Sequence, residues 1–438
     1  PQDAFADEAD TKARVERLEQ EVSELKAEIE ELRALGIAEQ RLDEIERKIE
    51  ILATEVEDLK VGEAAVTASR EAALPGLGPA ASKVYQKDSG VSIGGYGEAL
   101  YESFADERDD GTESGKTDQF DLLRAVFYFG YKFTDRFLFN SEIEFEHAST
   151  SESGSASVEF AYVDYLYRDW LNARAGLVLI PMGFINELHE PTVFLGAKRP
   201  ETESRIIPTT WRENGLGAYG DVGPFSYRSY VVNGLDASGF GASGLRGGRQ
   251  KGSKAKAVDF AWVGRFDYAG GFGLLAGGSL YVGDSGQDLT GADGGDLVVQ
   301  TVIWEGHVDY RYRGLELRGL YSRADLDEVA ELNSALGLEG SASVGEVLQG
   351  GYLQAGYDLL RGRNGRSLIP FIRWESINTQ HEVPEGYQSN AANDREILTL
   401  GLAYQPIEQL IIKLDYQDVD DEANTGVDQF NVGLGYIF

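Results

Sequence analysis

The chain has 438 residues, a formal net charge of −34 and no cysteine. The negative charge argues against a nucleic-acid partner. The lack of cysteine excludes a disulfide scaffold, a thiolate metal site and a cysteine nucleophile. The sequence contains no run of 18 apolar residues, so it predicts no transmembrane helix.

Residues 1–62 are predicted to form an α-helical coiled coil. Apolar residues recur at alternating spacings of three and four, and charged residues or alanine fill the positions between them. The repeat shifts by one residue near Gly36, where we expect a distorted or broken turn. A tight helical hairpin at residues 35–37 is the alternative, and the repeat alone does not fix the number of chains. The apolar positions are Val15, Leu18, Val22, Leu25, Ile29 and Leu32, then Leu42, Ile45, Ile49, Leu52, Val56 and Leu59.

Residues 63–90 lose the helical repeat. The stretch "AALPGLGPAAS" carries Pro75 and Pro79 among glycine and alanine. That composition predicts a semi-flexible linker between the coil and the rest of the chain.

Residues 91–438 show two-residue alternation in segments of roughly ten residues, which is typical of strands with two different faces. Residues 136–146, for example, alternate large apolar side chains with asparagine and glutamate. Long polar connections alternate with short turns, and the segments between them number about sixteen. This pattern predicts an all-β transmembrane barrel of about 16 antiparallel strands. A soluble β-sandwich or propeller is the alternative, but it would rarely carry three or four acids on one strand face.

The final segment, "NVGLGYIF", follows the same alternation. We expect it to close the barrel by pairing with the strand that begins near Val91, so that no sheet edge remains. Tyr436 and Phe438 would then lie in an aromatic girdle at the periplasmic interface.

Several stretches resemble the phosphate-selective porin O and P family. They are "FDLLRAVFYFGYKF", "AYVDYLYRDW", "ARAGLVLIPMGF", "WRENGLGAYGD" and "LIPFIRWE". The resemblance implies a trimeric sixteen-stranded porin of a Gram-negative-type outer membrane, in contact with lipid and lipopolysaccharide. It also implies a sub-type whose N-terminal coil lies in the periplasm, and a loop after the fifth strand that folds inward as the constriction.

That loop is expected at about residues 183–212, which are too long and too polar for an ordinary turn. The alternative is that it covers a subunit contact or the outer rim. Alternation also predicts a lumen lined by charged residues, which water can solvate. An arginine ladder would favour phosphate or carboxylates, although each arginine could instead neutralise a neighbouring acid. The candidate pore residues are Lys198, Arg199, Arg205 and Arg212 of the loop, with Arg124, Arg174, Arg265, Arg373 and Lys413 on the strands.

The predicted function is passive diffusion of small polar, mainly anionic solutes. The alternative is a structural role in which the coil tethers the barrel to the cell wall or a periplasmic partner. We expect no enzyme: His307 shares a strand face with Glu305 and Asp309, but no serine motif accompanies them. No cofactor is predicted, although acidic outer loops could bind Ca²⁺ or Mg²⁺.

Overall fold

The structure is a computed structural model that describes residues 17–27, 47–52, 74–149, 154–292, 294–361 and 363–438. The chain divides into two compact units, residues 1–67 and 68–438. In the first unit, residues 17–27 and 47–52 are helical. Most of the predicted coiled coil, including the shift near Gly36, lies outside the described residues, so the coil stays a prediction. No helix in the described ranges is long and apolar enough to cross a membrane.

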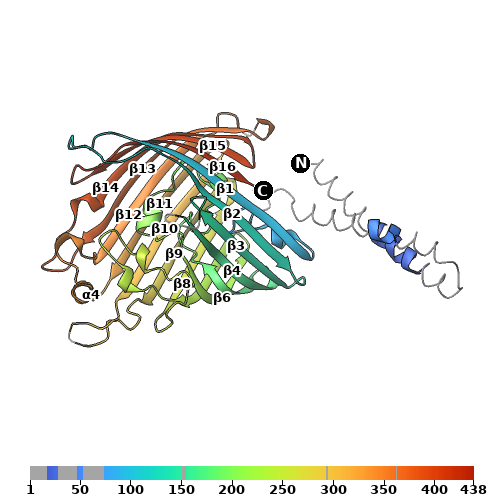
Figure 1. Cartoon of the computed structure of the whole chain (residues 1–438), viewed down its shortest axis with the longest axis horizontal. Coiled ribbons are helices and arrows are strands. Elements are labelled where there is room, and N and C mark those ends of the chain that lie inside the picture. The colour runs from blue at the N-terminus through green and yellow to red at the C-terminus, as the bar shows by residue number, and fades with distance from the viewer. Residues whose placement is uncertain (1–16, 28–46, 53–73, 150–153, 293, 362) are drawn as a thin grey trace. The chain divides into compact units, whose positions relative to one another are not determined.

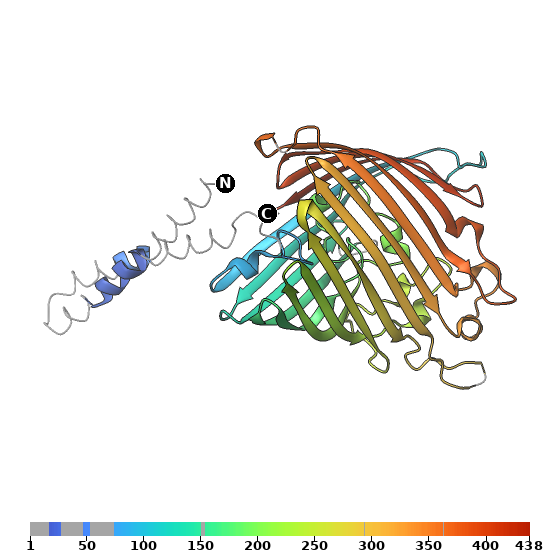
Figure 2. The ribbon, with the colours of Figure 1, turned by 180° about the vertical axis from the view of Figure 1, so that it is seen from behind.

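The second unit is a closed barrel in which every strand pairs antiparallel with its neighbours in chain order, and β1 pairs with β16 (Figures 1 and 2). The predicted barrel of about sixteen antiparallel strands is therefore confirmed. The strands are β1 (Gly90–Phe104), β2 (Gln119–Lys132), β3 (Phe137–Glu146), β4 (Ser155–Arg168), β5 (Leu171–Leu179), β6 (Arg212–Val222), β7 (Phe225–Asn233), β8 (Phe260–Gly270), β9 (Leu274–Asp284), β10 (Gln300–Tyr312), β11 (Leu315–Leu326), β12 (Val347–Tyr357), β13 (Ser367–Glu382), β14 (Asp394–Ile407), β15 (Leu410–Asp421) and β16 (Gln429–Ile437).

Burial alternates along the strands because successive side chains point to opposite faces of the sheet. On β15, the charged side chains of Lys413 and Asp415 are buried inside the barrel, whereas Leu414 and Tyr416 are exposed on its outside. The outer face carries many exposed aromatic and aliphatic side chains, and the inner face carries most of the charge. This inverted arrangement is typical of a barrel surrounded by lipid.

Long connections gather at one end of the barrel, marked by α4 in Figure 1, and short turns at the other. We call these the loop end and the turn end. The connection between β12 and β13, residues 358–366, is longer than the other connections of the turn end. The helical segments are η2 (Lys83–Gln86), η3 (Pro191–Val193), α3 (Thr202–Arg205), η4 (Ala237–Gly239), η5 (Arg246–Gly248), η6 (Gly271–Gly273), α4 (Val329–Leu336), η7 (Gly340–Ala342), η8 (Arg363–Gly365) and η9 (Ala391–Asn393).

The seam between β1 and β16 closes the sheet. Tyr96 pairs with Ile437, and Gly95 and Phe438 exchange backbone hydrogen bonds of 3.1 and 2.9 Å. The Phe438 ring lies on the outer surface, where its centroid is 6.5 Å from that of Phe127. The barrel therefore has no free edge along the seam, as the alternation in the last segment predicts.

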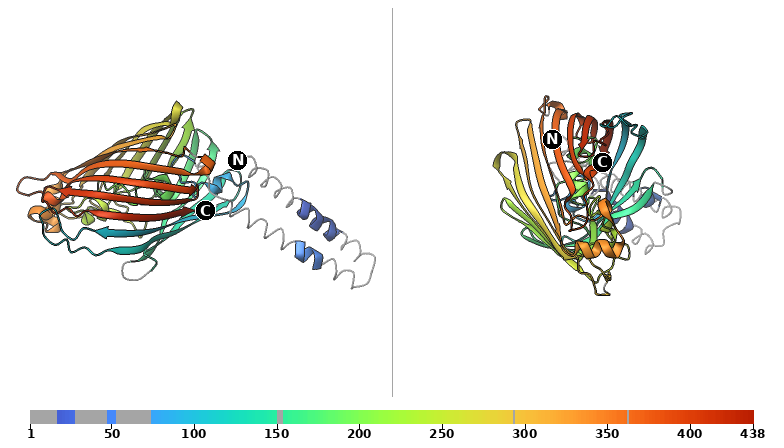
Figure 3. Two further views of the ribbon diagram at one scale, coloured as in Figure 1. Left: turned by 90° about the horizontal axis from the view of Figure 1, so that it is seen from above. Right: turned by 90° about the vertical axis from the view of Figure 1, so that its left-hand side faces the viewer.

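Two segments run inside the ring of strands (Figure 3). The first, which we call the crossing loop, is the connection between β5 and β6, residues 180–211. The second, the inner segment, comprises residues 74–86 just before β1. Most residues of both segments are buried. The inner segment belongs to the predicted linker, whose composition gave no indication that this part packs against the lumen wall.

Candidate functional site

The crossing loop is held by strands from several sides of the barrel. The Ala197 N–H donates to Asp415 on β15 (2.6 Å), and the Thr202 N–H donates to Glu375 on β13 (3.3 Å). Near the start of the loop, His189 Nε2 lies 3.0 Å from a carboxylate oxygen of Glu142 on β3. The structure thus places the loop predicted at 183–212 within the barrel, where it spans the lumen.

Glycines on the inner wall make room for these segments. A Cβ at Gly435 on β16 would overlap Pro191 of the crossing loop, and a Cβ at Gly130 on β2 would lie 2.6 Å from Val84 of the inner segment. Contacts that close are essentially never seen for a real side chain, so the two segments pack directly against strand backbone.

A cavity of about 470 Å³ opens at the loop end, between the crossing loop and the wall formed by β1 and β2. Four of the nine candidate pore residues line it: Arg124, Lys198, Arg199 and Arg205. Arg246, from the connection between β7 and β8, also lines it. Its acidic lining residues are Glu98, Glu102 and Glu201. The structure therefore gathers five basic and three acidic side chains around one space.

Three of the basic side chains in this cavity are paired with acids. Arg124 Nε lies 3.0 Å from Glu98, Lys198 Nζ lies 2.9 Å from Glu102, and Arg205 Nε lies 2.7 Å from Glu201. Arg199 instead donates to the backbone oxygen of His189 (3.1 Å). Within the described part of the chain, neither Arg199 nor Arg246 has a carboxylate within ion-pair distance. The paired charges largely cancel, and these two guanidinium groups give the cavity a basic excess.

Burial and neighbouring charges shift the pKa values of several groups at this end. Burial, together with the neighbouring Arg199, lowers the pKa of Arg246. Burial and the charges of Arg246 and Arg212 lower the pKa of Arg249 to about 9. Burial alone would raise the pKa of Glu201, but the neighbouring Arg395 and Arg205 guanidinium groups more than offset this effect. The pKa of Glu201 is therefore lowered. Each shift has the sign expected for a region where positive charge is in excess.

Arg174 lines a different cavity, of about 400 Å³, at the turn end. Its guanidinium pairs with Asp164 (2.9 Å) and stacks on the ring of Tyr162, 3.8 Å from the centroid. Leu74 and Tyr85 of the inner segment complete the wall of this cavity. Because Arg174 already has a carboxylate and an aromatic partner, it contributes little free positive charge there.

The side chains of the other four candidates are buried among protein groups. Arg212 pairs with Glu159 (2.7 Å), and Arg373 pairs with Glu375 (2.8 Å). For these residues, neutralisation of a neighbouring acid describes the contacts better than an open arginine ladder. Arg265 pairs with Asp267 (2.8 Å), and Lys413 Nζ lies 3.4 Å from the centre of the Phe194 ring.

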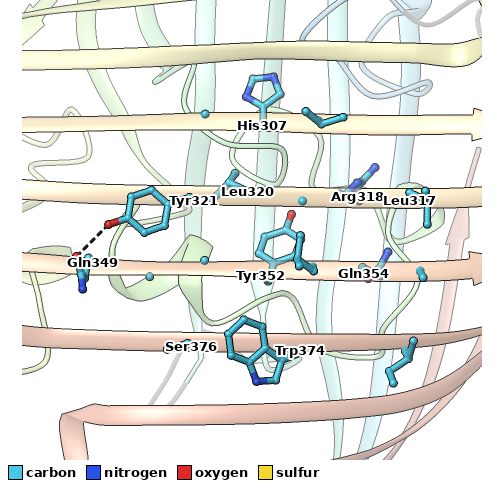
Figure 4. Close-up of a pocket in the computed structure, with 18 of the residues that line it drawn as sticks. His307, Leu317, Arg318, Leu320, Tyr321, Gln349, Tyr352, Gln354, Trp374 and Ser376 are labelled. Atoms are coloured by element: carbon cyan, nitrogen blue, oxygen red, sulfur yellow. Dashed lines mark hydrogen bonds between the residues drawn. The ribbon is translucent and has the colours of Figure 1, made fainter.

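A hollow of about 1080 Å³ lies on the outer face over β10 to β14 (Figure 4). It exists because the outward positions Gly306, Gly319 and Gly351 lack side chains between exposed neighbours such as Trp374. The hydroxyl group of Tyr321 donates to Gln349 within it (2.9 Å). Since its lining is mainly apolar and faces outward, we assign it to the lipid-facing surface and not to the pore.

His307 does not form the acid–base group that its strand position suggested. Its Nδ1 lies 2.8 Å from Glu305, and its Nε2 lies 2.8 Å from Asp267 on β8. Asp309 instead binds Arg311 and Arg318. With both ring nitrogens engaged by carboxylates, the imidazole has no nitrogen available for a substrate proton.

Metal binding finds no support in the described ranges, where no group of three or more histidine, aspartate or glutamate side chains could hold an ion. Neither Arg246 nor the inner segment was predicted from the sequence. Both lie in glycine-rich stretches, "GLRGGR" and "LPGLGP", which lack any periodicity that could assign them to a face. The stretch "LRGGRQK" carries three basic residues in a chain of net charge −34, and this local basic composition is the signal that could have identified Arg246.

The chain is similar to a protein of known sequence and to several solved structures. No known protein-family profile matches it. A protein of Aquifex aeolicus (strain VF5), described as an uncharacterized protein, is 38% identical over 375 residues, which are 83% of this chain and 83% of that protein.

Two solved structures share its fold with a TM-score of 0.52. One is a loop L8 deletion mutant of OmpT, an outer membrane protein of Vibrio cholerae (11% identity, covering 80% of this chain and all of that chain). The other is Salmonella typhi OmpF in complex with daunomycin (13% identity, covering 81% and 99%). The chain thus has the barrel fold of bacterial outer-membrane proteins, and it belongs to the same family as the Aquifex protein.

Proposed function

We propose that the protein is an outer-membrane porin through which small anionic solutes, phosphate-like or carboxylate-like, diffuse down their gradients. The closed sixteen-stranded barrel, its apolar outer face and its charged interior support this class of function. The resemblance to phosphate-selective porins supports the finer assignment. Diffusion requires no catalysed reaction. The barrel provides a path for the solute and an electrostatic field that acts on its charge.

The basic excess of the loop-end cavity carries the proposal. Arg199 and Arg246 face a water-accessible space, among three further basic side chains, and no acidic group of the described residues lies within ion-pair distance of either. Guanidinium groups bind carboxylate and phosphate oxygens through paired, charge-assisted hydrogen bonds. The narrowest region sets selectivity, and we place it at this cavity, where the local basic excess acts on a solute more strongly than the negative charge elsewhere in the chain.

The test is the reversal potential of the purified protein in planar bilayers under a salt gradient. Replacing Lys198, Arg199 and Arg205 by glutamine should lower the ratio of anion to cation permeability at least about threefold, because the excess positive charge is lost. The matched control neutralises three basic residues of exposed connections, Arg108, Lys116 and Lys254, and should leave the ratio nearly unchanged.

Two results would overturn parts of this proposal. If the barrel conducts no ions, even when residues 74–86 of the lumen are replaced by a Gly/Ser chain, the proposed porin function is wrong. An unchanged permeability ratio in the glutamine variant would remove the loop-end cavity as the selectivity site.

The assembly is also part of the proposal. We infer a homotrimer embedded in lipid and lipopolysaccharide, with the coil on the periplasmic side. The mass of the detergent-solubilised protein should be that of three chains, and a single-chain mass would contradict the trimer. The tethering role of the coil stays a prediction of the sequence.

A further inference from the structure

The inner segment is bound to the lumen wall by polar contacts along its length. The side-chain amide of Asn140 on β3 donates to the backbone oxygen of Ala81 (2.9 Å), and Lys83 Nζ donates to that of Ile93 on β1 (2.7 Å). The hydroxyl group of Tyr85 donates to Asp164 on β4 (2.6 Å). These contacts hold the segment against three strands, whereas an unstructured linker would make no such set of contacts.

The same segment is joined to the crossing loop. A carboxylate oxygen of Glu190 accepts hydrogen bonds from the backbone N–H groups of Ala80 (3.0 Å) and Ala81 (3.2 Å). All three residues are buried. A Cβ at Gly78 would overlap the Glu190 carboxylate, so a side chain at this position would displace that carboxylate from the Ala80 and Ala81 N–H groups. We call this contact the latch.

The lumen contains two cavities, one at each end of the barrel. The turn-end cavity is walled by the inner segment, the loop-end cavity is walled by the crossing loop, and the two cavities have no lining residue in common. Resting on the porin function proposed above, we propose that residues 74–86 are an autoinhibitory plug, which closes the barrel from the turn end through the latch at Glu190.

The composition of the plug suits reversible docking. Its buried apolar side chains are Leu77, Pro79, Ala80, Ala81 and Val84, and the two alanine side chains are only methyl groups. Hydrophobic stabilisation is proportional to the apolar area removed from water, so this short segment gains a limited amount from it. Most of its attachment is hydrogen bonding, which the water of an open lumen can replace at small net cost. The plug can therefore leave without disturbing the strands.

Docking should depend on pH. Burial raises the pKa of Glu190 from 4.5 to about 7, opposed by the Ala80 and Ala81 N–H groups and by His189, while Glu142 adds to the rise. Tyr128 on β2 also faces this carboxyl group. The docked state holds the proton more tightly than a solvated carboxyl group would, so docking weakens as the pH rises from about 4.5 to about 7. Conductance should rise over this range and then level off, and Glu190→Gln should abolish the dependence.

The decisive experiment compares single-channel conductance in the full chain with and without the plug. Replacing residues 74–86 by a Gly/Ser chain of equal length should raise mean conductance at least about twofold, because the lumen of a sixteen-stranded barrel is wide enough for water. Gly78→Val should act in the same direction by breaking the latch. Its control, Gly306→Val, adds the same side chain on the outer face, where a Cβ meets no atom within 4 Å.

A variant in which a disulfide holds the plug in its docked position tests whether docking lowers conductance. Because the chain has no cysteine, Gly78→Cys with Glu190→Cys can form a single disulfide; a Cβ at Gly78 would lie 2.8 Å from Glu190 Cγ. The oxidised variant should conduct less than the reduced one. Equal conductance of the native, Gly/Ser and Gly78→Val proteins would overturn the plug and leave the porin function standing. Silence of all variants would overturn the porin function.

Discussion

Replacing Glu187 by alanine should detach the crossing loop from the wall and destabilise its docked state by about 3–5 kcal/mol, the usual cost of breaking a buried ion pair. The Glu187 carboxylate lies 3.3 Å from Arg228 Nη1 and 3.6 Å from Arg265 Nη1. All three side chains are buried or nearly so. Without Glu187, two buried guanidinium groups are left to share Asp267.

The release can be measured with trypsin. Lys198, Arg199 and Arg205 lie inside the native barrel, so cleavage after them requires the loop to leave the lumen. The Glu187→Ala variant should be cut there at least about tenfold faster than the native protein, since each 1.4 kcal/mol multiplies an opening equilibrium by ten. Glu385→Ala, at an exposed position between β13 and β14, is the matched control. Native-like protection of the Glu187 variant would show that the loop is held by its other contacts.

Excising residues 185–205, with a short Gly/Ser bridge in their place, should give the largest change in conductance. The excision removes the material that spans the lumen, and it also removes Glu190, to which the inner segment binds. Single-channel conductance should rise at least about threefold, because a barrel of this size otherwise encloses an aqueous channel. It should exceed that of the variant in which only residues 74–86 are replaced.

The excised barrel should also have a weaker preference for anions. Lys198, Arg199 and Arg205 leave with the loop, and although four glutamates leave with them, the wider aqueous lumen screens the remaining wall charges more strongly. Arg124 and Arg246 would remain, so a residual preference that Arg246→Gln removes would assign part of the selectivity to the connection between β7 and β8. A heat-modifiable shift in gel mobility checks that the barrel still forms. A folded barrel with unchanged conductance would place the constriction elsewhere.

The strands could be predicted because a lipid-facing barrel imposes a simple rule on its sequence. Each strand must place apolar side chains outward every second residue, so Phe137 and Phe139 on β3, or Leu414 and Tyr416 on β15, carry the signal by themselves. The alternation of long and short connections supplied the strand count. Neither inference needed a distance between residues far apart in the chain.

The contents of the lumen could not be predicted in the same way. Whether an arginine in the lumen is paired depends on which groups surround it in the folded chain. Arg373 and Arg199 look alike in sequence, because each is followed two residues later by a glutamate. Arg373 lies against Glu375 on its own strand, whereas Arg199 has only a backbone oxygen in the described structure. Likewise, Gly78 and Pro79 are as typical of a linker as of a segment packed against strand backbone. Such differences arise from tertiary contacts, which leave no periodic pattern.

The continuous ring of strand pairing has a consequence for how the protein loses its structure. Because β1 and β16 are joined, no strand can peel away without breaking backbone hydrogen bonds on two sides, and the wall should unfold as one cooperative unit. The crossing loop and the inner segment contribute no bonds to that ring. Their rearrangement is therefore a separate, lower-energy transition, and the barrel can change what fills it while its wall stays native.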